Sequence, residues 1–223
     1  MNGAIGASLP VAVGVMISPL PIAAVVLMLS SAKAKVNAFA FLVGWVLAVF
    51  VIALVVAMLA GSSTDDDGGP AAWVSWTKIV LGVLVLFLCF TQWQGRPREG
   101  QQASPPKWMS AIDSFTPVKA TGLAVLLGGI NPKNLLLVIS GGATIAAAAP
   151  DDTTAQVVAS IVFAVVASLG VLLPIVIYLA MGDRAPSVLD AMKNWLVQHN
   201  NIVLAVLLLV IGVKLLGDGI AGL

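Results

Sequence analysis

The sequence predicts an all-α polytopic membrane protein whose six transmembrane helices form two inverted repeats of three helices each. Composition is the first observation behind this prediction: of 223 residues, 60% are hydrophobic and 9% are charged. Soluble domains carry about 25% charged residues. A chain so poor in charge cannot cover a globular surface with polar groups, so lipid must surround much of it. The other observations are six long apolar stretches and the sorting of charge between them.

Each apolar stretch is long enough to cross a bilayer as a helix, which takes about 20 residues. The stretches lie at 5–30, 37–61, 71–93, 117–148, 154–181 and 200–221. The first, fourth and fifth contain prolines in their interior, among them Pro19, Pro21, Pro132 and Pro174. Proline removes a backbone donor and clashes with the preceding turn. We therefore expect the first and fourth helices to be broken at their prolines.

Charge in the connections predicts the orientation. Basic residues of the connections occur only in the first, third and fifth: Lys33, Lys35, Arg96, Arg98, Lys107, Lys119, Arg184 and Lys193. The second and fourth connections carry acidic residues instead: Asp65, Asp66, Asp67, Asp151 and Asp152. Since basic loops stay on the cytoplasmic side, both termini are expected outside.

An internal repeat divides the chain. The segment "IVLGVLVL" at 79–86 resembles "IVLAVLLL" at 202–209, and each belongs to the third helix of a three-helix half. The expected units are a first repeat at 1–95, a cytoplasmic linker at 96–116 and a second repeat at 117–223. Because three spans per half is an odd number, the halves enter the membrane from opposite sides, as in many secondary transporters.

The repeat aligns two polar breaks. The first span carries "SPLP" at 18–21, and the fourth carries "NPKN" at 131–134. Backbone groups freed at a break must be satisfied inside the protein or in a wet cavity. Paired breaks in corresponding positions indicate a transport site. The expected substrate-binding residues at the breaks are Ser18, Pro19, Pro21, Asn131, Pro132, Lys133 and Asn134.

Lys133 lies near the middle of the fourth span, where an isolated charge costs about 3 kcal/mol. No carboxylate lies deep in a span where it could neutralise this lysine. One interpretation is that Lys133 binds an anionic group of a ligand, helped by the positive end of a half-helix near Asn134. The other is that Lys133 bonds carbonyls freed by the prolines and so ties the two broken helices together.

A second deep lysine, Lys214, lies four residues before Asp218, so the two side chains can pair on one helix face. Lys214 is a further candidate for substrate binding. Asp218 is the candidate for coupling transport to protons, because intramembrane ionisable residues are commonly functional.

Several classes of function lack their signatures. The single Cys89 excludes a cysteine zinc site, and the chain has no Walker motif, hydrolase motif or basic run. We therefore expect no enzymatic activity, no cofactor, no metal and no nucleic-acid partner.

The segments "SPLPIAAVVLML" and "GGINPKNLLLVISGG" resemble the lysine exporter (LysE) superfamily, and within it the actinobacterial GAP family of glycolipid-addressing, sulfolipid-addressing-protein-like proteins. Leu20 departs from the Pro-Gly-Pro of amino-acid exporters, which makes an amino-acid substrate less secure. The resemblance implies a multi-pass protein of the bacterial cytoplasmic (inner) membrane that moves envelope glycolipids outward, beside lipid-synthesis or export proteins. It also implies that the two break motifs form the functional core.

Three functions follow as expectations. The first is export or flipping of an anionic lipid or glycolipid of the cell envelope through the break at 131–134. The second is LysE-like secondary export of a small metabolite or amino acid. The third is a non-transporting scaffold of an envelope-lipid export machine. The broken helices weigh against it, because a scaffold has no use for costly polar groups at the midplane. A homodimer is compatible with such a thin bundle.

Overall fold

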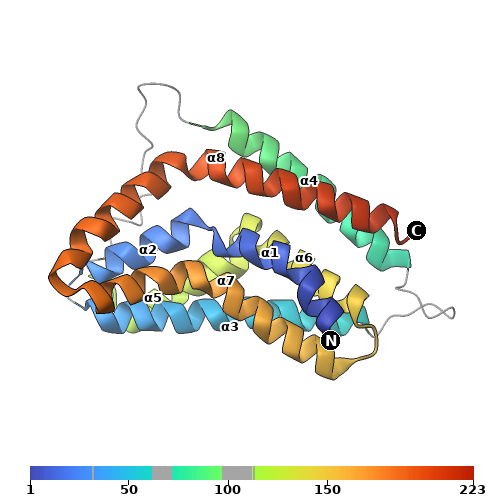
Figure 1. Cartoon of the computed structure of the whole chain (residues 1–223), viewed down its shortest axis with the longest axis horizontal. Coiled ribbons are helices and arrows are strands. Elements are labelled where there is room, and N and C mark those ends of the chain that lie inside the picture. The colour runs from blue at the N-terminus through green and yellow to red at the C-terminus, as the bar shows by residue number, and fades with distance from the viewer. Residues whose placement is uncertain (32, 62–71, 97–111, 113) are drawn as a thin grey trace.

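The computed structural model describes residues 1–31, 33–61, 72–96, 112 and 114–223. The described part of the chain is helical and contains no strand. The elements, shown in Figure 1, are α1 (Asn2–Met16), α2 (Pro19–Leu29), α3 (Ala34–Gly61), α4 (Ala72–Gln94), α5 (Pro117–Val125), the π-helix η2 (Leu126–Ile130), α6 (Pro132–Ala148), α7 (Thr153–Met181), the 3₁₀ turn η3 (Gly182–Arg184) and α8 (Ala185–Ile220).

The predicted membrane class is confirmed at the level of its helices. Four helical segments are long and apolar enough to cross a membrane, or up to six if each bent pair of helices forms one span. The bent pairs are α1 with α2, at 54°, and α5–η2 with α6, at 64°. Both bends lie at the predicted proline motifs. Since proline cannot continue the ladder of backbone hydrogen bonds, each motif begins a new helix.

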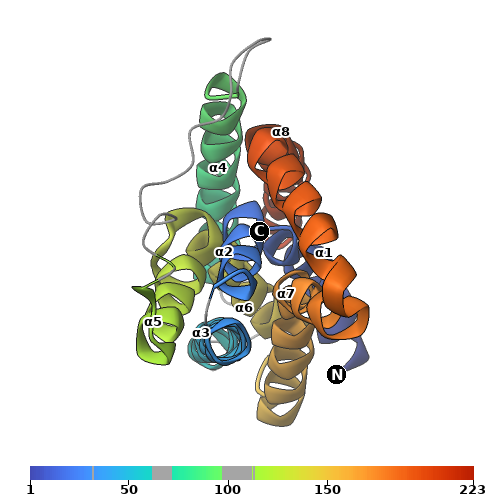
Figure 2. The ribbon, with the colours of Figure 1, turned by 90° about the vertical axis from the view of Figure 1, so that its left-hand side faces the viewer.

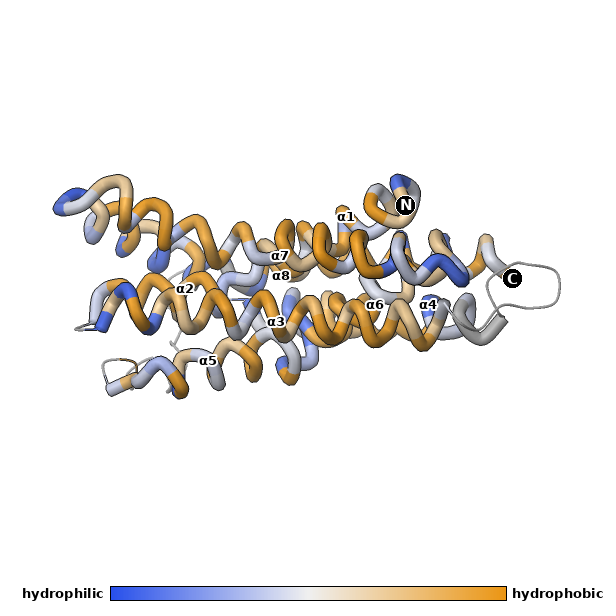
Figure 3. The backbone as a smooth tube through the Cα atoms, turned by 90° about the horizontal axis from the view of Figure 1, so that it is seen from below, coloured by the Kyte–Doolittle hydropathy of each residue, from blue (hydrophilic) through white to orange (hydrophobic). Residues whose placement is uncertain are grey.

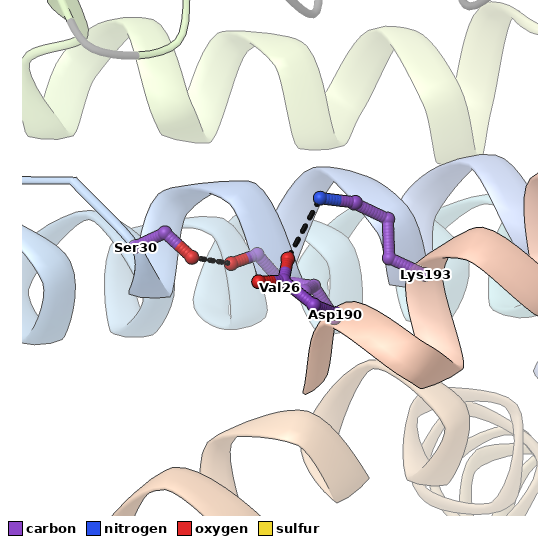
Figure 4. A network of polar contacts seen from close by, with 4 residues as sticks. All are labelled: Val26, Ser30, Asp190 and Lys193. Atoms are coloured by element: carbon purple, nitrogen blue, oxygen red, sulfur yellow. Dashed lines mark hydrogen bonds and ion pairs between the residues drawn. The ribbon is translucent and has the colours of Figure 1, made fainter. Parts of the chain in front are cut away.

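The connection predicted between the fifth and sixth spans is wrong, because most of it is helical. We expected a loop from about 182 to 199, but α8 already begins at Ala185. Ala185, Leu189 and Leu196 are buried and Met192 is partly buried, which gives an apolar stripe at helical spacing. This segment is amphipathic and therefore escapes a search for uniformly apolar stretches. Lys193 and Asp190 form an ion pair of 2.8 Å here, close to α2 (Figure 4).

The second predicted span packs on the fifth, and the third packs on the sixth. α3 contacts α7, and α4 contacts α8. Each broken span also packs against an unbroken helix: α1 and α2 contact α7, while α5 and α6 contact α3. Figure 2 shows α3, α5, α6 and α7 grouped around α2, with α4 and α8 standing beside this group. Phe41, Trp45 and Phe163 are among the largest buried side chains of the core.

Apolar side chains also cover the outer surface. On α3, Val43, Leu47, Val51 and Val55 are each about half exposed and lie four residues apart. Figure 3 shows that the tubes of α3 and α7 are hydrophobic along most of their length. An apolar outer face suits contact with the hydrocarbon of a bilayer. In water, an apolar surface this large would be unfavourable.

The two chain ends lie at one end of the molecule, and the α2–α3 and α7–α8 connections lie at the other (Figure 1). The predicted acidic loop at 65–67, and Arg98 and Lys107 of the predicted linker, lie outside the described residues.

Candidate functional site

Each break has the same local construction. Ser18 adopts an extended conformation directly before α2, and Pro19 is the first residue of that helix. Asn131 occupies the equivalent place before α6, and Pro132 follows it. Proline suits the first helical position, because its missing N–H has no partner within the helix in any case. The Asn131 side chain accepts a hydrogen bond from the Lys133 backbone N–H (3.1 Å), which caps the helix.

A π-helix widens the chain just before the second break. In η2 the Asn131 N–H donates to the Leu126 carbonyl (2.8 Å), five residues earlier. Such π-bulges are frequent at functional sites. The Trp45 ring of α3 packs against Gly128 of η2, where an added Cβ would lie 3.2 Å from the ring. Trp45 is fully buried, and its indole Nε1 has no hydrogen-bond partner among the described residues.

The two breaks meet in a short hydrogen-bond network. Lys133 Nζ donates to Ser18 Oγ (2.9 Å), and Ser18 Oγ donates to Asn134 Oδ1 (2.8 Å). Asn134 Nδ2 in turn donates to the Leu127 carbonyl (2.8 Å), a backbone group of the other half-helix. Ser18 and Asn134 are each 1% exposed. The network therefore ties the first span to the fourth. It combines Ser18 of the first motif with Lys133 and Asn134 of the second.

Lys133 is the only charged residue of this network. It is partly buried, and the ion pairs of the described residues, Lys193–Asp190 and Lys214–Asp218, do not involve it. The first turns of α2 and α6 both begin beside it, and a helix N-terminus carries partial positive charge. The junction therefore presents the Lys133 side-chain amine and two positive helix ends without a carboxylate partner among the described residues.

The remaining predicted residues take different places. Pro19 and Pro21 are buried beneath the junction, whereas Pro132 is exposed. Pro19 and Pro21 also remove two backbone donors from the first turn of α2. A buried donor there would otherwise lack a partner.

Lys214 and Asp218 lie away from the network. They form an ion pair with each other on α8, one helical turn apart, as the sequence predicted. The structure adds a third charged residue: Lys78 of α4 is 8% exposed, and both Asp218 and Lys214 act on it electrostatically. Sequence reasoning missed Lys78, because only the packing of α4 on α8 brings it to this pair.

Glycines beside the second break serve close packing. An added Cβ at Gly142 would lie 2.6 Å from the Ala53 carbonyl oxygen, and one at Gly129 would lie 2.9 Å from the Ile52 side chain. Only residues without a Cβ let α3 approach the fourth span this closely.

Apolar cavities adjoin both breaks. One of about 500 Å³ lies between the end of α1, the start of α2, α7 and the first part of α8. Another of about 440 Å³ lies between α3 and the residues around η2. Each break is thus polar on the side facing its partner and apolar on a side facing away.

Comparison with known proteins adds one finding. Residues 9–221 match the family model described as Sap, sulfolipid-1-addressing protein (SfLAP). Comparisons with curated proteins and with solved structures gave no significant match. The wider resemblance to the LysE superfamily stays a prediction. Since the match covers nearly the whole chain, including both break motifs, this protein belongs to the sulfolipid-1-addressing protein family.

Proposed function

We propose that this protein exports an anionic lipid or glycolipid of the cell envelope across the bacterial cytoplasmic membrane, through the junction of its two broken spans. The observation that carries the proposal is the place of Lys133. It lies where both breaks meet, its side-chain amine donates only to a neutral hydroxyl among the described residues, and it has no carboxylate partner there. The family name supports a role with a sulfolipid-related substrate.

The architecture that we propose is an inverted repeat of six spans with both termini outside. Its support is the reciprocal packing, in which each broken span contacts the second helix of the other half. The α2–α3 and α7–α8 connections, which hold the predicted basic residues Lys33 and Arg184, lie at the end opposite to the chain termini (Figure 1). Under the rule that basic loops stay cytoplasmic, this end faces the cytoplasm.

A sulfate or phosphate headgroup replaces Ser18 as the partner of Lys133 in this mechanism. Charge-assisted hydrogen bonds to such oxygens are stronger than a bond to a neutral hydroxyl. The exchange frees Ser18 from Lys133 and loosens the tie between the spans. The half-helices then shift at their breaks, which are the positions where the chain bends most easily. The helix tie and the ligand site thus become two stages of one cycle.

The protein acts here as a transporter and not as an enzyme. Its substrate comes from the membrane, so the proteins that make or further export this lipid are the expected partners. Asp218 has the buried Lys78 and Lys214 as neighbours, and it remains our candidate for coupling.

The test is lipid movement in vesicles containing the purified protein. The probe is phosphatidylglycerol with a fluorescent headgroup-side label, and a zwitterionic phosphatidylcholine with the same label is the comparison. We expect wild type to move the anionic probe faster than empty vesicles do, and Lys133→Met to abolish the gain. Lys119→Met is the matched control, because Lys119 is an exposed lysine of the same broken span.

Equal movement of the anionic probe in wild-type and empty vesicles would contradict the proposal. Uptake of a small soluble metabolite that depends on Lys133, with no lipid movement, would favour the exporter alternative. If neither moves and the protein instead retains lipid-export partners, the scaffold alternative gains.

A further inference from the structure

The larger apolar cavity forms a groove from the first break to the start of α8. Its walls include Met16 and Ile17 at the end of α1, Leu169 and Leu173 on α7, and Trp195 on α8. Every lining residue is hydrophobic or glycine. A polar ligand would leave its own hydrogen-bonding groups without partners against such walls, so the groove suits a hydrocarbon.

One end of the groove adjoins the polar junction. Ile17 is the residue directly before Ser18, whose hydroxyl accepts the hydrogen bond from Lys133. The Met16 carbonyl lies against Gly170 of α7, where an added Cβ would collide with it. Gly170 therefore lets α7 pack closely on the break and form the floor of the groove.

The other end lies where the membrane surface is expected. Trp195 is 54% exposed, and aromatic residues of this kind gather at bilayer interfaces. Close by in sequence, Lys193 forms an ion pair with the exposed Asp190, and η3 holds further charged residues. The groove thus runs from the interface to a break in the middle of a span. One leaflet of a bilayer has a hydrocarbon depth of about 15 Å, half of a core about 30 Å thick.

The long side of the groove is open. Leu169, Leu173 and Val176 line it and are 44%, 53% and 49% exposed. Together they form the outward face of α7, so a molecule dissolved in the bilayer can enter sideways. Its volume of about 500 Å³ falls within the usual range of ligand sites, about 300–1,000 Å³.

We propose that this groove is the loading site for an acyl chain of a lipid drawn from the cytoplasmic leaflet. The chain lies along α7 with its headgroup end at Trp195 and its tail end at Ile17. This inference rests on the proposed function and deepens it, since it makes a lipid chain part of what is recognised. The loaded chain holds the lipid beside the first break while it stays in contact with the bilayer.

Photocrosslinking tests the proposal in vesicles containing wild-type protein. The probe is phosphatidylglycerol with a diazirine either at the tail end or near the headgroup end of one chain. The tail-end probe should label peptides containing Met16, Ile17 and Ile22, and the headgroup-end probe should label peptides containing Met192 and Trp195. Labelling spread evenly over all membrane-facing helices would overturn the inference.

Two substitutions on one helix provide the matched comparison. Leu173→Trp fills the groove and should lower groove labelling about tenfold, since a loss of about 1.4 kcal/mol in binding suffices. Leu179→Trp places the same ring on α7 outside the groove, at 52% exposure against 53% for Leu173, and should leave labelling unchanged. Leu173→Ala, which keeps the groove open, should also retain labelling.

Equal labelling in Leu173→Trp and Leu179→Trp would overturn the inference. Lipid movement measured in the same vesicles separates the two claims. Movement without groove labelling removes the loading site and leaves the proposed function standing. Groove labelling without movement supports the loading site and removes transport.

Discussion

Stability measurements can distinguish the two interpretations of Lys133, namely a site for an anionic ligand and a tie between the two broken helices. Lys133→Met removes the charge and leaves the Ser18–Asn134 bond in place. Ser18→Ala removes the partner of both Lys133 and Asn134 and leaves buried polar groups unpaired, at a cost of about 1–3 kcal/mol. We expect Ser18→Ala to lower the Tm in detergent and Lys133→Met to leave it unchanged or higher. A Tm for Lys133→Met as low as that for Ser18→Ala would mean that the lysine is only a tie.

Asn134 should be the residue on which the junction depends most for stability. It accepts from Ser18 and donates to the Leu127 carbonyl, and it is 1% exposed. Asn134→Leu fills the space but leaves both partners unsatisfied, so we expect a loss of about 2–4 kcal/mol in total. Asn131→Ala removes only a helix cap and should cost about 1 kcal/mol. Denaturation in mixed micelles checks the order, and equal losses would contradict it.

The contact between α3 and the fourth span offers a test at the scale of elements. Gly142→Ala puts a Cβ 2.6 Å from the Ala53 carbonyl oxygen, so the helices must separate, and overpacking of this kind costs about 1–3 kcal/mol. Gly122→Ala is the control in the same broken span, because nothing lies within 4 Å of its added Cβ. It should be neutral or stabilise the helix by up to about 1 kcal/mol. Thermal unfolding of both variants provides the test. A lower Tm for Gly122→Ala than for Gly142→Ala would refute this account of the glycines.

The breaks could be predicted from sequence because proline acts locally. Pro19 and Pro132 each follow a polar residue, Ser18 or Asn131, and begin a new helix where the chain bends. Pro10 and Pro174 follow leucine instead and lie inside continuous helices. The start of α8 was not predicted, since residues 185–199 are amphipathic and a search for apolar stretches does not detect them. The stripe formed by Ala185, Leu189 and Leu196 was the available signal.

Contacts between elements were beyond the sequence. Lys133 and Asn134 were found as candidates from the break motif and its place in the fourth span, but the bond from Lys133 to Ser18 depends on how two distant spans meet. Lys78 was missed for the same reason, since its neighbours Lys214 and Asp218 lie on a helix of the other half. Sequence spacing predicts which charged residues are neighbours along one helix, but it does not predict which charged residues of two different helices are neighbours.

At the scale of the whole molecule, the proposed orientation predicts which ends a membrane-impermeant reagent reaches. In a Cys89→Ser background, Asn2→Cys and Leu223→Cys should react with an impermeant maleimide on intact cells, because both termini are expected outside. Ser187→Cys, exposed at the opposite end beside η3, should react only after permeabilisation. Labelling of Ser187→Cys in intact cells with protection of both termini would reverse the orientation and with it the direction of export.

The most direct measurement of the central claim is the lipid that the protein carries from its own membrane. Wild type, Lys133→Met and Lys119→Met would be purified in a mild detergent, and their Tm values would be compared to check that all three are folded. Their bound lipids would then be identified by mass spectrometry. We predict an anionic lipid or glycolipid enriched in wild type and in Lys119→Met, and depleted about tenfold or more in Lys133→Met, since loss of one charge-assisted contact is worth about 1.5–3 kcal/mol. The same anionic lipids at the same level in all three proteins would contradict a headgroup site at the junction of the two breaks.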